Sequence, residues 1–265
     1  MLTVLTYNLR HGGGDRLPAI TEVIAAQRPD VVAVQELGPP RSGTLRRLGT
    51  ALGMRGYAGR GWPGLWGQPV GVLLRPDLRV LSAGRVPGAF HHGAVRVDID
   101  TDRGALAVLS AHLCPYTGWG RLVEARRLAR AARPARPVLL LGDLNSLDPW
   151  RDHAAAVGAL PVRYRSRHLR ADGSVDTRAV ATLARAGFTD LFRAVGRGRA
   201  ETVPTRYAGT EFSGAGMRLD YALGTAPVAR VATDCRVVDE QAAHTASDHY
   251  PVRITLDLAA RTLAR

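Results

Sequence analysis

The segment PVLLLGDLN, residues 137 to 145, is an apolar run that ends in an aspartate and an asparagine. A strand covered by protein on both faces shows such a continuous run, whereas a strand with one solvent face alternates apolar and polar residues. The segment therefore predicts a strand in the interior of an α/β protein. Asp143 and Asn145 stand at its end, so polar groups are expected where this strand leaves the core.

Further strand and helix patterns lie on both sides of this segment. Alternating or continuous apolar residues predict strands at residues 2–8, 31–36, 69–75, 94–100, 105–113, 218–224 and 250–258. Helical periodicity is present at residues 17–26, 44–52, 120–132 and 176–186. No long Pro/Gly/Ser linker interrupts the pattern. We therefore expect residues 1–265 to form a single mixed α/β domain, with strands enough for two sheets.

The composition, 46% hydrophobic and 22% charged over 265 residues, is typical of a globular protein. No apolar run approaches the roughly 18 residues of a membrane span, and the first residues lack a signal-peptide pattern, so a cytoplasmic location is expected. Cys114 and Cys235 are the only cysteines, too few for a disulfide framework or a thiolate zinc site.

The charge balance is unusual. All 36 basic residues are arginine, and the net charge is +13. The absence of lysine excludes P-loop NTPases, ordinary protein kinases and enzymes that form a Schiff base through a lysine. A strong positive field attracts polyanions, and guanidinium groups suit phosphate. A GC-rich coding bias explains the arginines equally well, and the sequence does not separate the two interpretations.

Six predicted strand ends each carry a carboxylate, a carboxamide or an imidazole. They are Asn8; Glu36; His112; Asp143 with Asn145; Asp220; and Asp248 with His249. Ligands collect at strand ends in sheet proteins, so we expect these groups to converge. Carboxylate and amide oxygens suit Mg²⁺ or Mn²⁺, and histidine with a carboxylate partner suits proton transfer. A turn explains one such residue, but not six together.

The motifs TYN, QE, S-x-H-L, GDLN, R-x-D-Y and SDH occur in this order over residues 2 to 257. As a set they closely resemble the endonuclease/exonuclease/phosphatase superfamily, the metal-dependent phosphoesterases related to deoxyribonuclease I. The resemblance implies a four-layer α/β/β/α sandwich, in which two mixed β-sheets are flanked by helices and the active site lies at one end.

The resemblance also implies roles for the residues at the strand ends. It places Asn8, Glu36 and Asp248 in the metal site, with Glu36 as the main ligand of Mg²⁺ or Mn²⁺. The catalytic residues that it implies are Asp143, which orients or deprotonates water; Asn145 and His112, which face the phosphate; and the pair His249 and Asp220. Either Asp143 or His249 could be the general base, and we favour Asp143 acting on water.

Two regions depart from the family or stand outside its motifs. Many members carry a basic residue before the strand at 94–100, where this chain has Phe90, His91 and His92. We expect these to be surface loop residues, with a phosphate-donating histidine as the alternative. Trp62 and Trp66 could stack on a base, although we favour packing over the core.

Further substrate contacts are suggested by an aromatic residue and an arginine-rich segment. Tyr116, four residues after His112, could reach the phosphate. In PVRYRSRHLR, residues 161 to 170, an extended chain would place Arg163, Arg165 and Arg167 on one edge, as a phosphate track. A solvated loop is the alternative. His244 matches no motif and is expected to be a loop residue.

These observations predict a metal-dependent phosphoester hydrolase that cleaves a phosphodiester by direct attack of water, without a covalent intermediate. The positive charge favours nucleic acid as the substrate or partner. The alternative is a phosphatase or phosphodiesterase that acts on a small-molecule, sugar or lipid phosphate ester, because the catalytic residues do not distinguish these substrates. A silent binding module is disfavoured by the complete set of metal and histidine positions.

Overall fold

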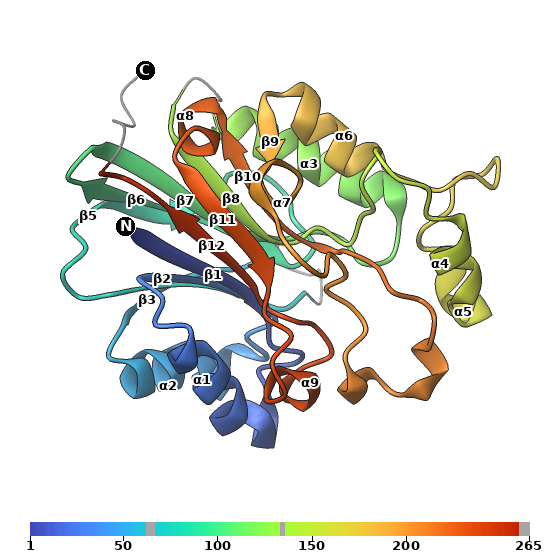
Figure 1. Ribbon diagram of the computed structural model, residues 1–265, viewed down its shortest axis with the longest axis horizontal. Coiled ribbons are helices and arrows are strands. Elements are labelled where there is room, and N and C mark those ends of the chain that lie inside the picture. Colours follow the sequence, from blue (N-terminus) through green and yellow to red (C-terminus); the bar gives the residue numbers. More distant parts are fainter. Residues whose placement is uncertain (62–66, 133–135, 260–265) are drawn as a thin grey trace.

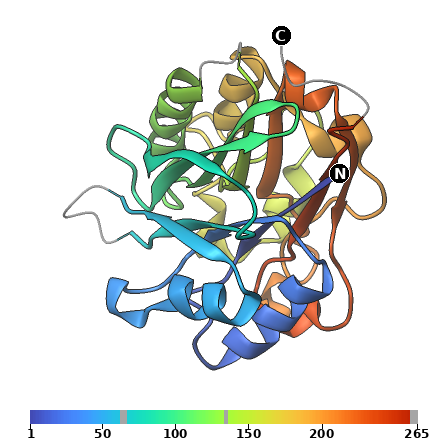
Figure 2. The same ribbon diagram turned by 90° about the vertical axis from the view of Figure 1, so that its left-hand side faces the viewer.

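The computed structural model describes residues 1–61, 67–132 and 136–259. Two six-stranded sheets lie face to face, and helices cover the outer face of each (Figures 1 and 2). The expected four-layer α/β/β/α sandwich is thus confirmed. Among the described residues no helix is long and apolar enough to cross a membrane.

The first sheet is built mostly from the two ends of the chain. Its strands, in spatial order, are β11 (Ala232–Val237), β12 (Val252–Leu256), β1 (Leu2–Asn8), β2 (Val31–Gln35), β4 (Val70–Leu74) and β3 (Arg55–Gly59). Only the pair β1 and β2 is parallel. The outer face of this sheet is covered by α1 (Leu17–Ala26) and α2 (Thr44–Leu52) (Figure 1).

The second sheet comes from the middle of the chain. Its strands, in spatial order, are β5 (Val80–Arg85), β6 (Gly93–Thr101), β7 (Gly104–His112), β8 (Val138–Asp143), β10 (Asp220–Thr225) and β9 (Phe188–Asp190). The helices α3 (Gly118–Ala132) and α6 (Arg178–Arg185) cover its outer face (Figure 1). Shorter helices are α4 (Ala154–Ala159), α5 (Val162–Arg165), α7 (Leu191–Val195), α8 (Ala226–Ala229) and α9 (Ala243–Ala246).

Strand β8 is apolar throughout because both of its faces are buried. Leu139 and Leu141 belong to the core between the two sheets, whereas Val138 and Leu140 pack under α3 and α6. Because side chains alternate between faces along a strand, the inward series 139, 141 leads to Asp143. The carboxylate therefore points toward the other sheet at the end of the sandwich.

All eight predicted strands and all four predicted helices are present, but the sequence did not predict β3, β5, β9 and β11. These four are the edge strands of the two sheets, and β3 and β5 are largely exposed. Edge strands with solvated faces lack the apolar runs that identified the others. The extended conformation considered for residues 161–170 is wrong, because this segment begins with the helical turn α5.

Candidate active site

Strand register brings three of the predicted catalytic residues to one level. The parallel pair β7 and β8 places His112 beside Asp143, and the antiparallel pair β8 and β10 places Asp220 beside the same residue. Gly142 has φ 136°, and a Cβ at this position would lie 1.9 Å from the carbonyl oxygen of Ala111. The glycine of the GDLN motif is thus required for β8 to lie close against β7.

Asn8 joins the two sheets at this level. Its Nδ2 donates to Asp143 Oδ2 at 3.1 Å and to Glu36 Oε1 at 3.3 Å. Its Oδ1 accepts the backbone N–H of Arg10 at 3.0 Å, which fixes the orientation of the amide. Asn8 therefore faces both carboxylates with its amino group, so its visible role is to hold Glu36 and Asp143 in place.

Asp143 is buried between two imidazoles. Its Oδ2 lies 3.3 Å from His112 Nε2 and 3.8 Å from His249 Nε2. Its Oδ1 accepts the backbone N–H of Asn145 at 2.8 Å. Burial alone would raise the pKa of this carboxyl, but His112 and His249 outweigh it and hold the pKa well below its usual range. Asp143 is therefore ionised at neutral pH.

His249 and Asp220 form the expected pair. His249 Nδ1 lies 2.7 Å from Asp220 Oδ2, and both residues are buried. Burial opposes the charged ring, but the carboxylates of Asp220 and Asp143 raise the pKa of His249 well above its ordinary value. The paired carboxylate fixes the ring with Nδ1 protonated and leaves Nε2 facing Asp143.

His112 and Asn145 complete this cluster on the second sheet. Asn145 Nδ2 lies 2.9 Å from His112 Nε2 and donates to the carbonyl oxygen of Leu113 at 3.0 Å. Burial opposes protonation of His112, but Asp143 and Glu36 raise the pKa of its ring. Asn145 has φ 47°, a left-handed conformation that turns the chain at the end of β8.

Glu36 receives donors from two loops. Its Oε2 accepts the backbone N–H of His11 at 2.9 Å and Gln68 Nε2 at 3.0 Å. Its φ of 55° bends the chain at the end of β2, so that the carboxylate reaches Asn8. Burial works against ionisation, but His112 and the His11 N–H lower the pKa of Glu36. A partly accessible, ionised carboxylate of this kind suits a divalent cation.

A second group could also hold a metal ion. Asp143, Asp220 and His249 each offer a ligand atom within 4.8 Å of the others. The bond between Asp220 and His249, however, already occupies one carboxylate oxygen and one ring nitrogen. The raised pKa of His249 favours a cationic ring, which repels a metal ion. The chemistry of the donors therefore favours Glu36 as the metal ligand.

Asp248 lies at the solvent side of the site, with its side chain 26% exposed. Arg10 Nη1 lies 3.1 Å from Asp248 Oδ2. The neighbouring Ser247 Oγ donates to the carbonyl oxygen of Asn8 at 2.7 Å, which ties this segment to the end of β1. Arg10, which we did not predict, thus competes with any metal ion for the Asp248 carboxylate.

His92 is part of the site, and the expectation of a surface loop is wrong for this residue. Its ring is buried and stacks on the ring of His112, with centroids 3.9 Å apart. Its Nδ1 accepts the backbone N–H of Gln68 at 2.8 Å. Burial lowers the pKa of His92 to about 2, so the ring is neutral. Phe90 is also buried, and His91 is half-buried with its ring nearly perpendicular to that of Tyr116.

The three residues predicted to contact the substrate, Tyr116, Arg163 and Arg165, lie in different surroundings. Tyr116 is exposed and lies against Arg167, whose Cζ is 5.6 Å from its ring. Arg163 instead pairs with Glu211, at 2.5 Å. Arg165 donates from Nε to the carbonyl oxygen of Leu160. Because α5 is helical, these arginines do not form the extended phosphate track that we considered.

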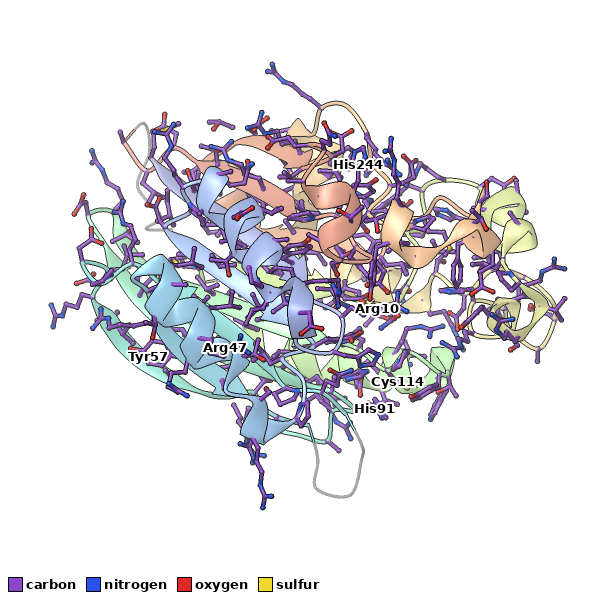
Figure 3. All side chains as sticks on the ribbon, turned by 90° about the horizontal axis from the view of Figure 1, so that it is seen from below. Arg10, Arg47, Tyr57, His91, Cys114 and His244 are labelled. Carbon is purple, nitrogen blue, oxygen red and sulfur yellow. The ribbon has the colours of Figure 1, made fainter. Side chains whose placement is uncertain are left out.

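A hollow of about 260 Å³ adjoins the catalytic cluster, and we call it the side pocket. Asn145, Asp248 and His249 are among the residues that line it. The apolar side chains of Leu160, Phe212 and Met217 also line it, and Arg10 and Arg167 add positive charge. In Figure 3, Arg10, Cys114 and His91 lie in the same part of the molecule, away from Arg47 and Tyr57.

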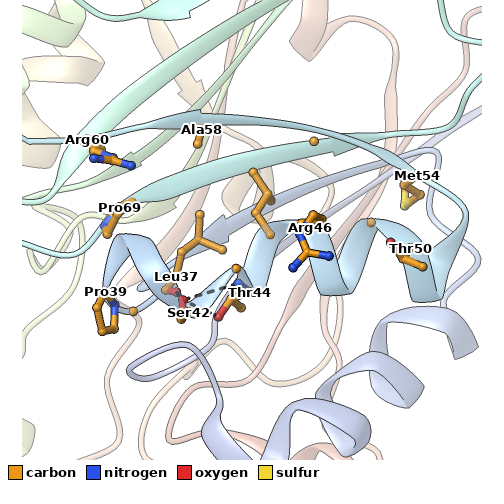
Figure 4. Close-up of a pocket in the computed structure, with 15 residues that line it drawn as sticks. Leu37, Pro39, Ser42, Thr44, Arg46, Thr50, Met54, Ala58, Arg60 and Pro69 are labelled. Carbon is orange, nitrogen blue, oxygen red and sulfur yellow. Dashed lines mark hydrogen bonds between the residues drawn. The ribbon is translucent and has the colours of Figure 1, made fainter.

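Another hollow, of about 480 Å³, lies between α2 and β3 (Figure 4). Arg46 and Arg60 border it, but none of its described lining residues is a carboxylate, an imidazole or a thiol. We therefore assign it no part in the chemistry. Trp62 and Trp66 lie outside the described residues.

The sequence profile of the Endonuclease/Exonuclease/phosphatase family matches residues 5–249. The chain belongs to this family. As a member it is a metal-dependent phosphoester hydrolase. No curated protein sequence matches it significantly.

Solved structures with the same fold cover nearly the whole chain. An AP endonuclease from Archaeoglobus fulgidus is 19% identical, with a TM-score of 0.74, over 97% of this chain and 100% of its own. A humanized D. rerio TDP2 is 20% identical, with a TM-score of 0.66, over 97% and 98%. A mannosyl-6-phosphatase from Bacteroides thetaiotaomicron is 17% identical, with a TM-score of 0.68, over 97% and 100%. At these identities the likeness establishes the fold and leaves the substrate open.

Proposed function

We propose that this protein hydrolyses a phosphodiester by direct attack of water. The observation that carries the proposal is the position of Asp143, ionised and held between His112 and His249. A carboxylate in this position can orient a water molecule and accept hydrogen bonds from it. The two imidazoles supply positive charge where the phosphate would gain negative charge during attack.

Each residue of the cluster then has a distinct task. The protonated His249 ring donates from Nε2 to a phosphate oxygen, while Asp220 holds the ring through Nδ1. The amide of Asn145, next to His112, is a second donor to the phosphate. Because the pKa of Asp143 is low, proton transfer from water to this group is uphill, and we assign it mainly to orienting the water.

Glu36 would hold the divalent cation, with Asn8 keeping its carboxylate in place. Bound Mg²⁺ or Mn²⁺ supplies Lewis acidity, which withdraws electron density from the non-bridging phosphate oxygens and stabilises the leaving oxygen. Asp248 joins this site only if Arg10 releases its carboxylate.

The surroundings of the site support a diester in which one ester group is small. A volume of about 260 Å³ in the side pocket suits a single sugar or nucleoside unit. The net charge of +13 favours nucleic acid as the carrier of that unit. The second candidate is a small-molecule, sugar or lipid phosphate ester, which the small volume of the side pocket and its apolar lining residues Leu160, Phe212 and Met217 also suit. The cytoplasmic location stays a prediction from the sequence.

A substrate screen tests the proposal. The protein is incubated with phosphomonoesters, phosphodiesters, and single- and double-stranded nucleic acids. Each reaction contains Mg²⁺ or Mn²⁺, and EDTA is added in the control. We expect diester hydrolysis that EDTA abolishes and that Glu36→Ala and His249→Ala reduce at least a hundredfold. His244→Ala is the matched control, because His244, in α9, bonds the carbonyl oxygen of Asp239 and is not part of the cluster. Full activity of the first two variants would refute the mechanism.

A further inference from the structure

The amide of Gln68 lies between Glu36 and His11. Its Nε2 is 3.0 Å from Glu36 Oε2 and 2.5 Å from His11 Nδ1. Its Oε1 is buried and has no hydrogen-bond partner among the described residues. The amide nitrogen of Gln68 therefore lies beside the Glu36 carboxylate and a ring nitrogen of His11. Its amide oxygen is removed from solvent and accepts no hydrogen bond in return.

Rotation of this amide by half a turn would exchange its oxygen and nitrogen, which occupy nearly the same volume. Oε1 would then face Glu36 Oε2 and His11 Nδ1. Three acceptors pointing at one place repel each other unless a cation lies between them. Without a cation, the amino group of Gln68 faces Glu36 and His11. With a cation, the amide oxygen would face them. This single rotation is the difference between the two arrangements.

We propose that Gln68 Oε1 and His11 Nδ1 complete the metal site together with the Glu36 carboxylate. The inference rests on the proposed function, since it takes Glu36 as the ligand of the catalytic metal. It assigns a ligand role to two residues that lie outside the motifs of the sequence.

The surrounding structure holds both residues in place. The backbone N–H of His11 donates to Glu36 Oε2 at 2.9 Å, and the backbone N–H of Gly12 donates to the carbonyl oxygen of Glu36 at 2.6 Å. The backbone N–H of Gln68 is tied to His92 Nδ1 at 2.8 Å. Both loops are thus anchored to the site, and little rearrangement is needed to bring the ligand atoms together.

The composition of this ligand set predicts which ion it prefers. One carboxylate, one amide oxygen and one imidazole include a nitrogen donor, which suits Mn²⁺ better than Mg²⁺. Asp248 is a weaker candidate for the third position, because its carboxylate pairs with Arg10 at 3.1 Å.

Calorimetric titration with Mn²⁺ alone tests the proposal without any substrate. We expect Gln68→Leu and His11→Ala each to weaken Mn²⁺ binding about 10- to 100-fold. Gln68→Glu, which keeps an oxygen ligand, should bind at least as tightly as the wild type. His244→Ala is the control and should not change the affinity. Unfolding curves recorded in EDTA verify that each variant is folded.

Pulsed electron paramagnetic resonance of bound Mn²⁺ gives a second readout. The wild type should show the coupling of an imidazole ¹⁴N, and His11→Ala should abolish it. Wild-type affinity in both Gln68→Leu and His11→Ala, with binding still abolished by Glu36→Gln, would overturn this inference and leave the proposed function intact. If the wild type bound no Mn²⁺ and hydrolysed diesters in EDTA, both proposals would fail together.

Discussion

The imidazole rings of His92 and His112 are stacked in parallel, with centroids 3.9 Å apart and an interplanar angle of 4°. One ring is neutral, because burial lowers the pKa of His92 to about 2, and the other is drawn toward the charged form by Asp143 and Glu36. A neutral ring is a better stacking partner for a cationic ring than a second cation would be. His92 thus acts as a positioning residue for His112.

The stacking predicts the effect of two substitutions. His92→Ala leaves a gap beside His112 and should lower kcat/KM for the diester about tenfold or more, since the ring is no longer fixed against Asp143. His92→Phe keeps an aromatic face and should retain most of the activity. Steady-state kinetics on the preferred diester compare the two variants. Equal losses in both would show that the hydrogen bond to Gln68, rather than the stack, is what matters.

The pairing of His92 with His112 also shows where prediction from the sequence ends. Asp143, Asp220 and His112 were predictable, because each continues the inward series of a buried strand and the register aligns the three strand ends. His11, Gln68 and His92 lie on loops, and their approach to Glu36 and His112 depends on how the sheets pack. No periodicity in the sequence encodes this packing. For His92, the signal in the sequence was its position next to His91, directly before the strand predicted at residues 94–100.

The pair of His249 and Asp220 predicts a pH-dependent stability. The folded pKa of His249 is raised, so its contribution is fully present below the unfolded value of about 6.5. The contribution is lost as the pH rises through the folded pKa. Asp220→Asn should therefore destabilise the protein most at slightly acidic pH and least at alkaline pH. Urea unfolding at several pH values measures this difference.

An NMR titration of the His249 ring provides the independent check. The wild-type ring should titrate well above its ordinary range, and Asp220→Asn should bring the midpoint down. Identical midpoints in the two proteins would contradict the assignment of Asp220 as the partner that holds the charge on His249.

The buried guanidinium of Arg218 predicts a large effect on stability. Its Nη2 lies 2.5 Å from Asp190 Oδ2 and 3.2 Å from Asp148 Oδ2, and all three side chains are at most 5% exposed. Arg218→Ala leaves the buried Asp190 carboxylate without its ion-pair partner and removes one of the cations beside Asp148, which keeps Arg151 at 3.4 Å. The substitution should cost about 3–5 kcal/mol in free energy of unfolding. Arg236→Ala removes an exposed arginine that lies 3.8 Å from Asp234 and should cost less than about 1 kcal/mol. Urea unfolding of both variants decides whether burial makes the difference.

A cluster of five arginines around one hollow indicates a contact surface for nucleic acid. Arg85, Arg96, Arg127, Arg130 and Arg136 line a hollow of about 540 Å³ on the outer face of the second sheet, beside α3. Arg96 pairs with Asp98 and Arg127 bonds the carbonyl oxygen of Ala89, but Arg85, Arg130 and Arg136 have no ion-pair partner in the part of the chain that the structure describes. Guanidinium groups gathered in one place favour binding of a phosphate backbone.

If the substrate is nucleic acid, replacing Arg85, Arg130 and Arg136 by serine should weaken its binding. The slope of log affinity against log salt concentration should fall by about 1 for each lost phosphate contact. Hydrolysis of a small diester should not change, because the hollow does not include the catalytic residues. A control variant with serine at Arg28, Arg79 and Arg197 removes the same charge elsewhere. Equal losses of affinity in both variants would mean that only net charge matters, and indifference of the wild type to DNA would favour the small-molecule substrate.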